Sequence, residues 1–163
     1  MKPGVARVTA RPATEGDLKD VVSLFREMLD AIPYYNVLAK EGERGKYTLR
    51  SLKAKLRGDE HSVLVVRDGS RLLGFAFSHF DDHLIWLDWF AVNPAFRRRG
   101  VGSAMLRKLV ETAPARKAHK VWCDSRTTNG PAKATLRKNG FREIAELEDH
   151  WYGQDFILWE RPA

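Results

Sequence analysis

Two aspartates stand in apolar surroundings, where an ionised carboxylate is unfavourable. Asp88 lies in the stretch Leu84–Val92, which is rich in Ile, Trp and Phe, and Asp124 follows the apolar Val121-Trp122-Cys123. A positioned carboxylate can act as a general base and take a proton from an attacking nucleophile. Both aspartates are candidate bases, and the alternative for each is a structural ion pair with an arginine. We place Asp88 ahead, because an acid between Trp and Phe is harder to explain by structure alone.

A basic loop with two glycines follows the first of these stretches. Leu84–Val92 reads as a strand, Asn93-Pro94 ends it, and apolar residues recur at helical spacing from Val101 onward. Between strand and helix lies Arg97-Arg98-Arg99-Gly100-Val101-Gly102. Glycines let the backbone approach a ligand closely, and the unpaired N–H groups of a helix start attract an anion. The sequence therefore predicts a phosphate-binding loop, although it lacks the Gly-Lys-Ser/Thr of nucleotide-hydrolysing loops and the Gly-x-Gly-x-x-Gly of dinucleotide-binding ones.

The positive charge of the chain is concentrated around this loop. The net charge is +7, yet the segment from Arg97 to Arg142 holds 13 lysines and arginines against only Glu111 and Asp124. A polyanionic cofactor with a pyrophosphate and a 3′-phosphate would account for much of this charge. A nucleic acid is the less favoured partner, because no aromatic RNA-binding signature accompanies the basic residues.

Composition places the chain among globular proteins. Its 163 residues, 44% hydrophobic and 30% charged, suit one domain spanning 1–163. No apolar run of about 20 residues predicts a membrane span, and Met1-Lys-Pro-Gly lacks the apolar core of a signal peptide. The lone Cys123 can form no internal disulfide, which favours a reducing cytoplasm. The five histidines show no metal-ligand spacing, so we expect no metal.

The remaining segments predict one mixed α/β sheet without a linker or repeat. We expect helices over 18–32, 49–56, 101–113 and 131–140, and a polar loop opening at Tyr34. Strands are expected over 5–11, 63–66, 72–79, 84–92 and 121–124, with a final hairpin formed by 141–146 and 151–160. We expect Phe156, Ile157, Leu158 and Trp159 to lie in the core or at the interface of a homodimer.

Three motifs resemble the GNAT acetyltransferase superfamily, in the family's order and across nearly the whole chain. Arg97-x-x-Gly100-x-Gly102 is similar to its acetyl-CoA-binding signature, Arg/Gln-x-x-Gly-x-Gly/Ala. Asn129-Gly-Pro-Ala132-x-x-x-x-Arg137-Lys138-Asn139-Gly140-Phe141 resembles its second motif, and Val8-x-x-Arg11-Pro12-Ala13-Thr14-x-x-Asp17-Leu18 resembles its usual start. The resemblance implies a single GNAT-like domain: a mixed, mostly antiparallel sheet flanked by helices, with splayed central strands. It also implies acetyl transfer from acetyl-CoA to a primary amine by direct attack.

The resemblance also implies which residues bind acetyl-CoA. The backbone of Phe90, Ala91 and Val92 would meet the thioester oxygen, and the phosphates would meet the loop and the start of the second motif: Arg97, Arg98, Arg99, Gly100, Val101, Gly102, Ser103 and Asn129. The chain departs from the family at Leu136, where a tyrosine usually protonates the leaving thiolate. Leucine has no proton to donate. Either Tyr152 replaces that acid, or the thiolate leaves unassisted.

The acceptor amine stays open between two similarities. Leu87-Asp88-Trp89-Phe90 is similar to a stretch of polyamine acetyltransferases, whereas Trp122-Cys-Asp-Ser-Arg126 resembles the strand end of ribosomal-protein N-terminal acetyltransferases. The first favours a small amine and the second a protein N-terminus or lysine. Tyr34, Tyr35 and Trp151 are candidate substrate contacts, with ordinary packing as their alternative. Competing functions are a non-catalytic acyl-CoA-binding regulatory module and, less favoured, a nucleic-acid-binding protein.

Overall fold

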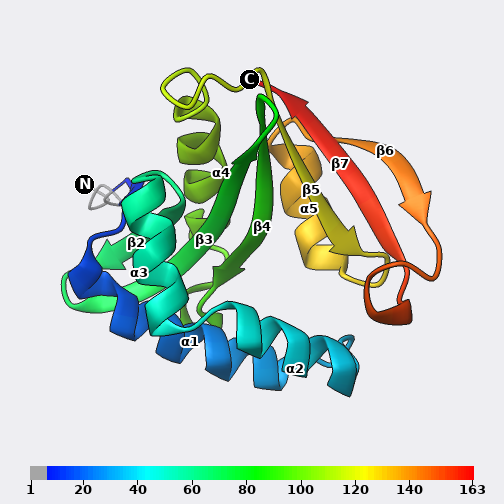
Figure 1. Ribbon diagram of the computed structural model, residues 1–163, viewed down its shortest axis with the longest axis horizontal. Helices are drawn as coiled ribbons and strands as arrows, with labels where there is room; N and C mark the ends of the chain where they lie inside the picture. Colours follow the sequence, from blue (N-terminus) through cyan, green and yellow to red (C-terminus); the bar gives the residue numbers. More distant parts are fainter. Residues whose placement is uncertain (1–6) are drawn as a thin grey trace, which may run out of the picture.

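Seven strands form one mixed sheet in the computed structural model, which describes residues 7–163 (Figure 1). Their bounds are β1 Ala10–Pro12, β2 Val63–Asp68, β3 Arg71–Asp81, β4 Leu84–Val92, β5 Lys120–Arg126, β6 Arg142–Leu147 and β7 Phe156–Pro162. The order across the sheet is β1-β2-β3-β4-β5-β7-β6, and every neighbouring pair is antiparallel except β4–β5. The predicted fold class is thus confirmed. The expected strand start at Val5 and the residues Met1–Gly4 lie outside the described part.

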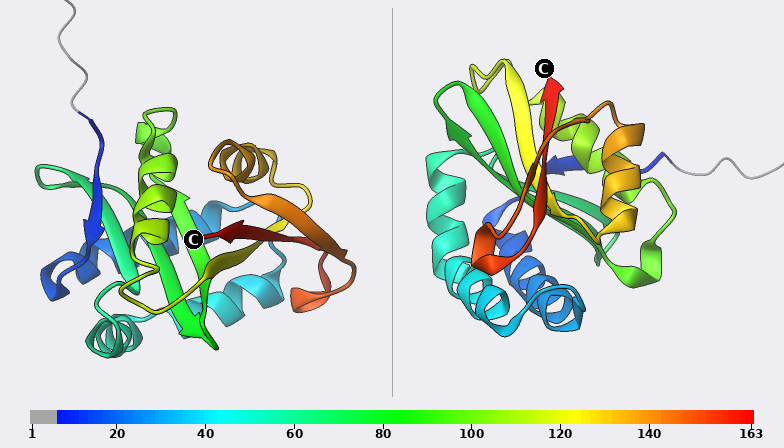
Figure 2. Two further views of the ribbon diagram at one scale, coloured as in Figure 1. Left: turned by 90° about the horizontal axis from the view of Figure 1, so that it is seen from above. Right: turned by 90° about the vertical axis from the view of Figure 1, so that its right-hand side faces the viewer.

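Five α-helices cover the two faces of the sheet (Figure 2). They are α1 Leu18–Ala31, α2 Val37–Lys46, α3 Leu49–Gly58, α4 Val101–Glu111 and α5 Gly130–Lys138. One core lies between the sheet and α1 and α3, and the second lies between the sheet and α4 and α5. Within residues 7–163 no helix is both long and apolar enough to cross a bilayer.

The expected polar loop after Tyr34 is wrong, because most of it forms α2. Asn36 caps this helix by accepting a hydrogen bond from the Ala39 N–H at 2.8 Å. Its only buried residues are Ala39 and Glu43, so no apolar stripe marks the helix in the sequence. Gly42 and Gly45 weaken its helix propensity further.

The final hairpin is shorter than expected at its second strand. Residues Trp151–Gly153 form a 3-10 turn, and β7 begins only at Phe156. Tyr152 has a φ of 57°, a left-handed conformation that interrupts an extended strand. Trp151 and Tyr152 are therefore connection residues, and the edge-strand alternative for them is wrong.

The first half of β7 belongs to the monomer core. Phe156, Ile157 and Trp159 are buried in the single chain, which supports the core interpretation for these three residues. A homodimer stays a prediction. The cytoplasmic location also stays a prediction, and it rests on Cys123, which is a buried free thiol.

The predicted splay of the central strands is confirmed. β4 and β5 pair from Leu84↔Lys120 to Leu87↔Cys123, although both strands continue beyond that point. On its other edge β4 stays paired with β3, but the register shifts so that Asp88 has no partner between the pairs Phe77↔Trp89 and Ser78↔Leu87. Such a bulge bends the strand and inverts the alternation of its side chains. The sheet therefore opens immediately after Leu87 and Cys123.

Candidate active site

The two candidate bases occupy the first unpaired positions on the two arms of the splay. Asp88 follows the last paired residue of β4, and Asp124 follows the last paired residue of β5. The sheet thus brings together both acids that sequence analysis singled out. Their surroundings differ, and this difference separates their roles.

Asp88 is engaged by two basic side chains. Its Oδ2 lies 2.9 Å from Nδ1 of His79 on β3 and 3.7 Å from Nζ of Lys55 on α3. The side chain of Asp88 is 15% exposed. These contacts match the structural alternative, in which the carboxylate holds neighbouring elements together.

Asp124 is half-buried, largely desolvated, and forms no ion pair in the described structure. Among residues 7–163 no lysine, arginine or histidine forms an ion pair with it. Burial raises the pKa of its carboxyl group to about 7; a hydrogen bond from Trp151 opposes that rise, and the charges of Asp88 and Glu43 add to it. A base with a pKa near neutrality both accepts a proton readily and is available to do so at physiological pH.

The glycine loop has the strand–loop–helix geometry predicted for it. Gly100 caps α4 with a φ of 78°, a left-handed conformation that favours glycine. The first N–H of the helix with a protein acceptor is that of Ala104, which donates to the Gly100 carbonyl at 2.9 Å. In the described structure no backbone N–H from Arg97 to Ser103 donates to a protein acceptor. The loop thus presents consecutive free donors at the positive end of a helix dipole, which suits a pyrophosphate.

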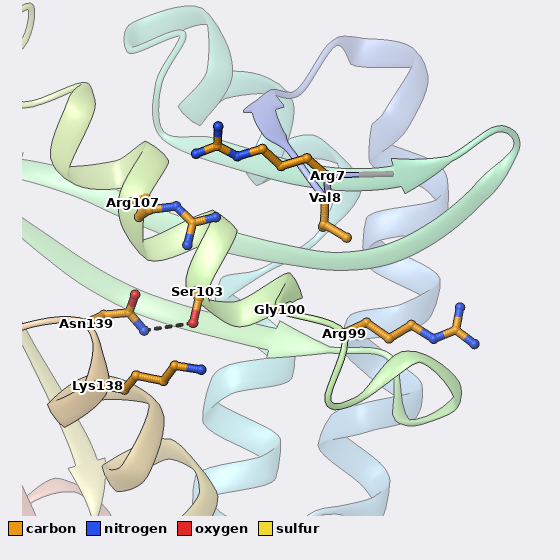
Figure 3. Close-up of a pocket in the computed structure, with 8 residues that line it drawn as sticks. All are labelled: Arg7, Val8, Arg99, Gly100, Ser103, Arg107, Lys138 and Asn139. Carbon is orange, nitrogen blue, oxygen red and sulfur yellow. Dashed lines mark hydrogen bonds between the residues drawn. The ribbon is translucent and has the colours of Figure 1, made fainter. Parts of the chain in front are cut away.

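A cationic cleft of about 340 Å³ adjoins this loop (Figure 3). Its lining residues are Arg7, Val8, Arg99, Gly100, Ser103, Arg107, Lys138 and Asn139. Ser103 Oγ accepts a hydrogen bond from Asn139 Nδ2 at 2.9 Å, which ties α4 to the end of α5. Arginine and lysine at such a cleft fit phosphate groups that extend beyond the loop.

Sequence analysis missed three cations of the cleft: Arg7, Arg107 and Lys138. Arg107 lies one helical turn after Ser103, and this spacing is the signal that could have identified it. Arg7 joins the cleft from the start of the described chain, and no local pattern places it there.

The other predicted cofactor residues lie around the same splay. Phe90, Ala91 and Val92 remain paired with β3 but lie beyond the last pair with β5, so their free edge faces the gap. A Cβ on Gly102 would lie 3.4 Å from Thr135 Cγ2 and 3.7 Å from Val92 Cγ2. The start of α4 therefore packs between α5 and the end of β4. Asn129 caps α5 by accepting from the Ala132 N–H at 3.2 Å.

The two positions considered for a general acid, Leu136 and Tyr152, both make other contacts. Leu136 is fully buried in the core beside α4. Tyr152 donates its hydroxyl proton to Glu43 Oε1 at 2.8 Å. This proton is already engaged with a carboxylate, so Tyr152 in this conformation acts as a contact between α2 and the β6–β7 connection.

The segment between α1 and α2 contacts both arms of the splay. The ring of Tyr35 packs edge-on against Trp89 of β4, with centroids 5.7 Å apart. The carbonyl of Tyr34 accepts hydrogen bonds from Arg126 of β5 and, at 3.0 Å, from Gln154 Nε2. The α1–α2 segment thus bridges the two arms at the wide end of the splay.

The connection between β6 and β7 contacts the α1–α2 segment and Asp124. Asn36 Nδ2 donates to the Tyr152 carbonyl at 3.0 Å. Trp151 is 47% exposed beside it and reaches Asp124 with its indole. Trp151 and Tyr35 therefore lie near Asp124, whereas Tyr34 lies near Arg97 and Asn129; the role of all three as acceptor contacts stays a prediction.

Residues 7–163 hold no cluster of three or more His, Cys, Asp and Glu side chains suited to a metal. The absence of a metal from the reaction stays a prediction.

Comparisons with known proteins agree with this architecture. The Acetyltransferase (GNAT) family model matches residues 23–141. An N-alpha-acetyltransferase from Sulfolobus acidocaldarius is 27% identical over 93% of this chain and 90% of its own. A ribosomal protein bS18 alanine N-acetyltransferase from Salmonella typhimurium is 28% identical over 59% of this chain and 64% of its own. The structure of PaiA N-acetyltransferase from Thermoplasma acidophilum, in complex with coenzyme A, superimposes with a TM-score of 0.79 at 17% identity over 96% of this chain and 99% of that one.

The chain belongs to the GNAT family of acetyltransferases, because the family model matches well over half of its length. It is an N-acetyltransferase, the activity that both relatives by sequence share.

Proposed function

We propose that this protein transfers the acetyl group of acetyl-CoA to the α-amine at the N-terminus of a polypeptide, with Asp124 as the general base. The observation that carries the proposal is a largely desolvated carboxylate, without an ion pair in the described structure, at the end of the splayed strands, beside a segment that bridges both arms. The names of the two relatives by sequence support the same acceptor class.

We place acetyl-CoA across the cationic cleft, the glycine loop and the gap between β4 and β5. The adenosine phosphates would meet Arg107 and Lys138 in the cationic cleft, the pyrophosphate would meet the free N–H groups from Arg97 to Ser103, and the pantetheine arm would enter the gap beside Phe90. The coenzyme A complex of the Thermoplasma acidophilum neighbour supports coenzyme A binding on this fold.

The reaction needs a neutral amine at the base. An N-terminal ammonium has a pKa of about 7.7–8.0, so a carboxylate with a pKa of about 7 can take its proton at little cost. The freed nitrogen attacks the thioester carbon, and a backbone N–H at the end of β4 stabilises the charge that develops on oxygen. The C–S bond then breaks and the nitrogen loses its second proton to water, giving the amide and coenzyme A thiolate. Thiols ionise near ~8.5, so the thiolate can leave without an acid at Leu136.

The bridged acceptor side favours a chain end over an internal lysine. The α1–α2 segment contacts β4 through Tyr35 and β5 through Tyr34, and the β6–β7 connection is hydrogen-bonded to it. We expect a terminal amine to reach Asp124 end-on between these segments. A lysine within a folded surface would bring chain on both sides of the acceptor residue, which these segments oppose.

A panel of acceptors tests this function through release of coenzyme A. We expect turnover with short peptides that have a free N-terminus, and little with the same peptides after N-terminal blocking even when they contain lysine. Preferential turnover of spermidine or another small amine would overturn the acceptor class and support the polyamine similarity at Asp88. No turnover with any amine would overturn the proposal.

A further inference from the structure

Glu43 is a buried carboxylate that links three elements. It lies on α2, is 8% exposed, and accepts hydrogen bonds from Trp89 Nε1 of β4 at 2.9 Å and from the Tyr152 hydroxyl at 2.8 Å. Lys46 one turn later pairs with it at 3.1 Å. One side chain on α2 thus contacts both β4 and the β6–β7 connection.

The residue before Glu43 makes this contact possible. A Cβ built on Gly42 would lie 2.7 Å from the hydroxyl oxygen of Tyr152 and 2.8 Å from its Cε1. Only glycine lets the tyrosine ring lie against α2 at this distance. Gly45, one turn later on the same helix, has nothing within 4 Å of its own added Cβ. The close approach is therefore specific to Gly42.

The charge of Glu43 also reaches the base. Asp124 faces Asp88 from β4, Glu43 and Lys46 from α2, and the indole of Trp151 from the β6–β7 connection, while Tyr35 lies near it from the α1–α2 segment. Burial is the main cause of the raised pKa of Asp124. The negative charges of Asp88 and Glu43 add to the rise, and Trp151 and Lys46 oppose it.

We propose that Glu43 is a positioning residue for acetyl transfer, which fixes Trp89 and Tyr152 around the acceptor and keeps the base ready to accept a proton. The proposal rests on the proposed function, because it takes Asp124 as the base. It assigns to α2 a role in acceptor binding that does not involve cofactor binding.

The first experiment compares the pH dependence of kcat/KM for the acceptor in wild type and Glu43→Gln. Glutamine keeps the volume and one acceptor oxygen but removes the charge. We expect the acidic midpoint to move to lower pH by about half a unit to one unit, because the base loses a negative neighbour. The KM for acetyl-CoA should not change. A midpoint that stays in place or moves to higher pH would contradict the proposal.

The second experiment separates positioning from folding. Gly42→Ala and Gly45→Ala add the same methyl group to the same helix, and both should raise its helix propensity. Because only Gly42→Ala displaces Tyr152, we expect its acceptor KM to rise by about tenfold or more, with KM for acetyl-CoA and the thermal midpoint matching Gly45→Ala. Equal acceptor KM values in the two variants would overturn the positioning role.

The second experiment also keeps the two proposals distinguishable. It uses whichever acceptor the panel identifies and does not depend on which aspartate is the base. Activity retained by Asp124→Asn would overturn the proposed base, whereas the comparison of Gly42→Ala with Gly45→Ala would still decide the role of the Glu43 contact.

Discussion

Asp124, the proposed base, has a raised pKa that affects stability as well as the proposed chemistry. Its carboxyl group is largely desolvated and forms no ion pair in the described part of the chain, and its pKa rises from 3.8 to about 7. Between these values the folded protein holds a proton that the unfolded chain has released. The corresponding stabilisation is fully present below about pH 4 and is lost as the pH rises through about 7.

Replacing the base should therefore stabilise the fold and abolish the chemistry. We expect Asp124→Asn to raise the free energy of unfolding at pH 8 by up to about 4 kcal/mol, because no charge remains to be buried, and to change it far less at pH 4. Turnover should fall by about 100-fold or more. Denaturant unfolding at both pH values measures the first effect. A loss of stability at pH 8 would show that the ionised carboxylate is not strained there.

Asp88 is the matched control for that prediction. Its carboxylate is engaged by His79 and Lys55, so Asp88→Asn removes partners that the folded state uses. We expect it to lower the free energy of unfolding by about 1–3 kcal/mol at pH 8, opposite in sign to Asp124→Asn. The two carboxylates occupy equivalent positions in the splay, and only their neighbours differ.

Arg107 should recognise the 3′-phosphate of the cofactor. If Arg107 forms a charged hydrogen bond with that phosphate in the cleft, Arg107→Ala should weaken coenzyme A binding by about 10-fold to 100-fold. Binding of 3′-dephospho-coenzyme A should not change. Lys108→Ala is the control, because that residue lies on the same helix and pairs with Glu111 at 3.4 Å. Equal losses for both forms of coenzyme A would place the 3′-phosphate elsewhere.

At the scale of the elements, the loop between β4 and α4 depends on space in front of its free N–H groups. Gly102→Glu should abolish measurable coenzyme A binding, because its side chain and negative charge would occupy the pyrophosphate position. Its added Cβ makes only ordinary contacts at 3.4 Å and beyond, so the fold should persist. Gly58→Glu makes the same change at an open position on α3 and should bind normally. Calorimetry that finds equal affinities for the two variants would contradict the assignment of the loop.

How far the sequence predicts each element depends on whether its signal is local. β4 was predicted with its observed bounds, because its apolar residues and the following Asn93-Pro94 are local signals. The helix α2 was missed, because it buries Ala39 and Glu43 without an apolar stripe. The function of Glu43 could not be predicted for the same reason, since its partners lie 46 and 109 positions away.

The two aspartates show the same limit at the site. Their residue types and apolar neighbours predicted that both were candidates, and the splay brings them together. Their order of preference depended on partners from other elements. His79 and Lys55 contact Asp88, whereas Asp124 forms no ion pair in the described structure, and neither fact can be read from the residues beside them in the sequence.

At the scale of the whole molecule, the sheet is continuous except between the second halves of β4 and β5. Two cores lie on its opposite faces and hold β4 and β5 in place along their paired halves. Beyond Leu87 and Cys123 the two strands diverge. The glycine loop follows the end of β4, and the α1–α2 segment contacts both strands. The helices α4 and α1 lie on opposite faces of the sheet (Figure 2), and we propose that cofactor and acceptor approach the gap from these different faces.

The most direct test of this account is the pH profile of kcat/KM for an N-terminal peptide, measured with saturating acetyl-CoA in wild type, Asp124→Asn and Asp88→Asn. We predict that wild-type activity rises through an acidic midpoint near pH 7, where the desolvated carboxyl group loses its proton. Asp88→Asn should keep such an acidic limb, moved to lower pH because the base loses a negative neighbour. Asp124→Asn should lose the limb and recover activity only as the free amine increases in alkali. The opposite pattern, with the limb lost in Asp88→Asn and retained in Asp124→Asn, would contradict the account.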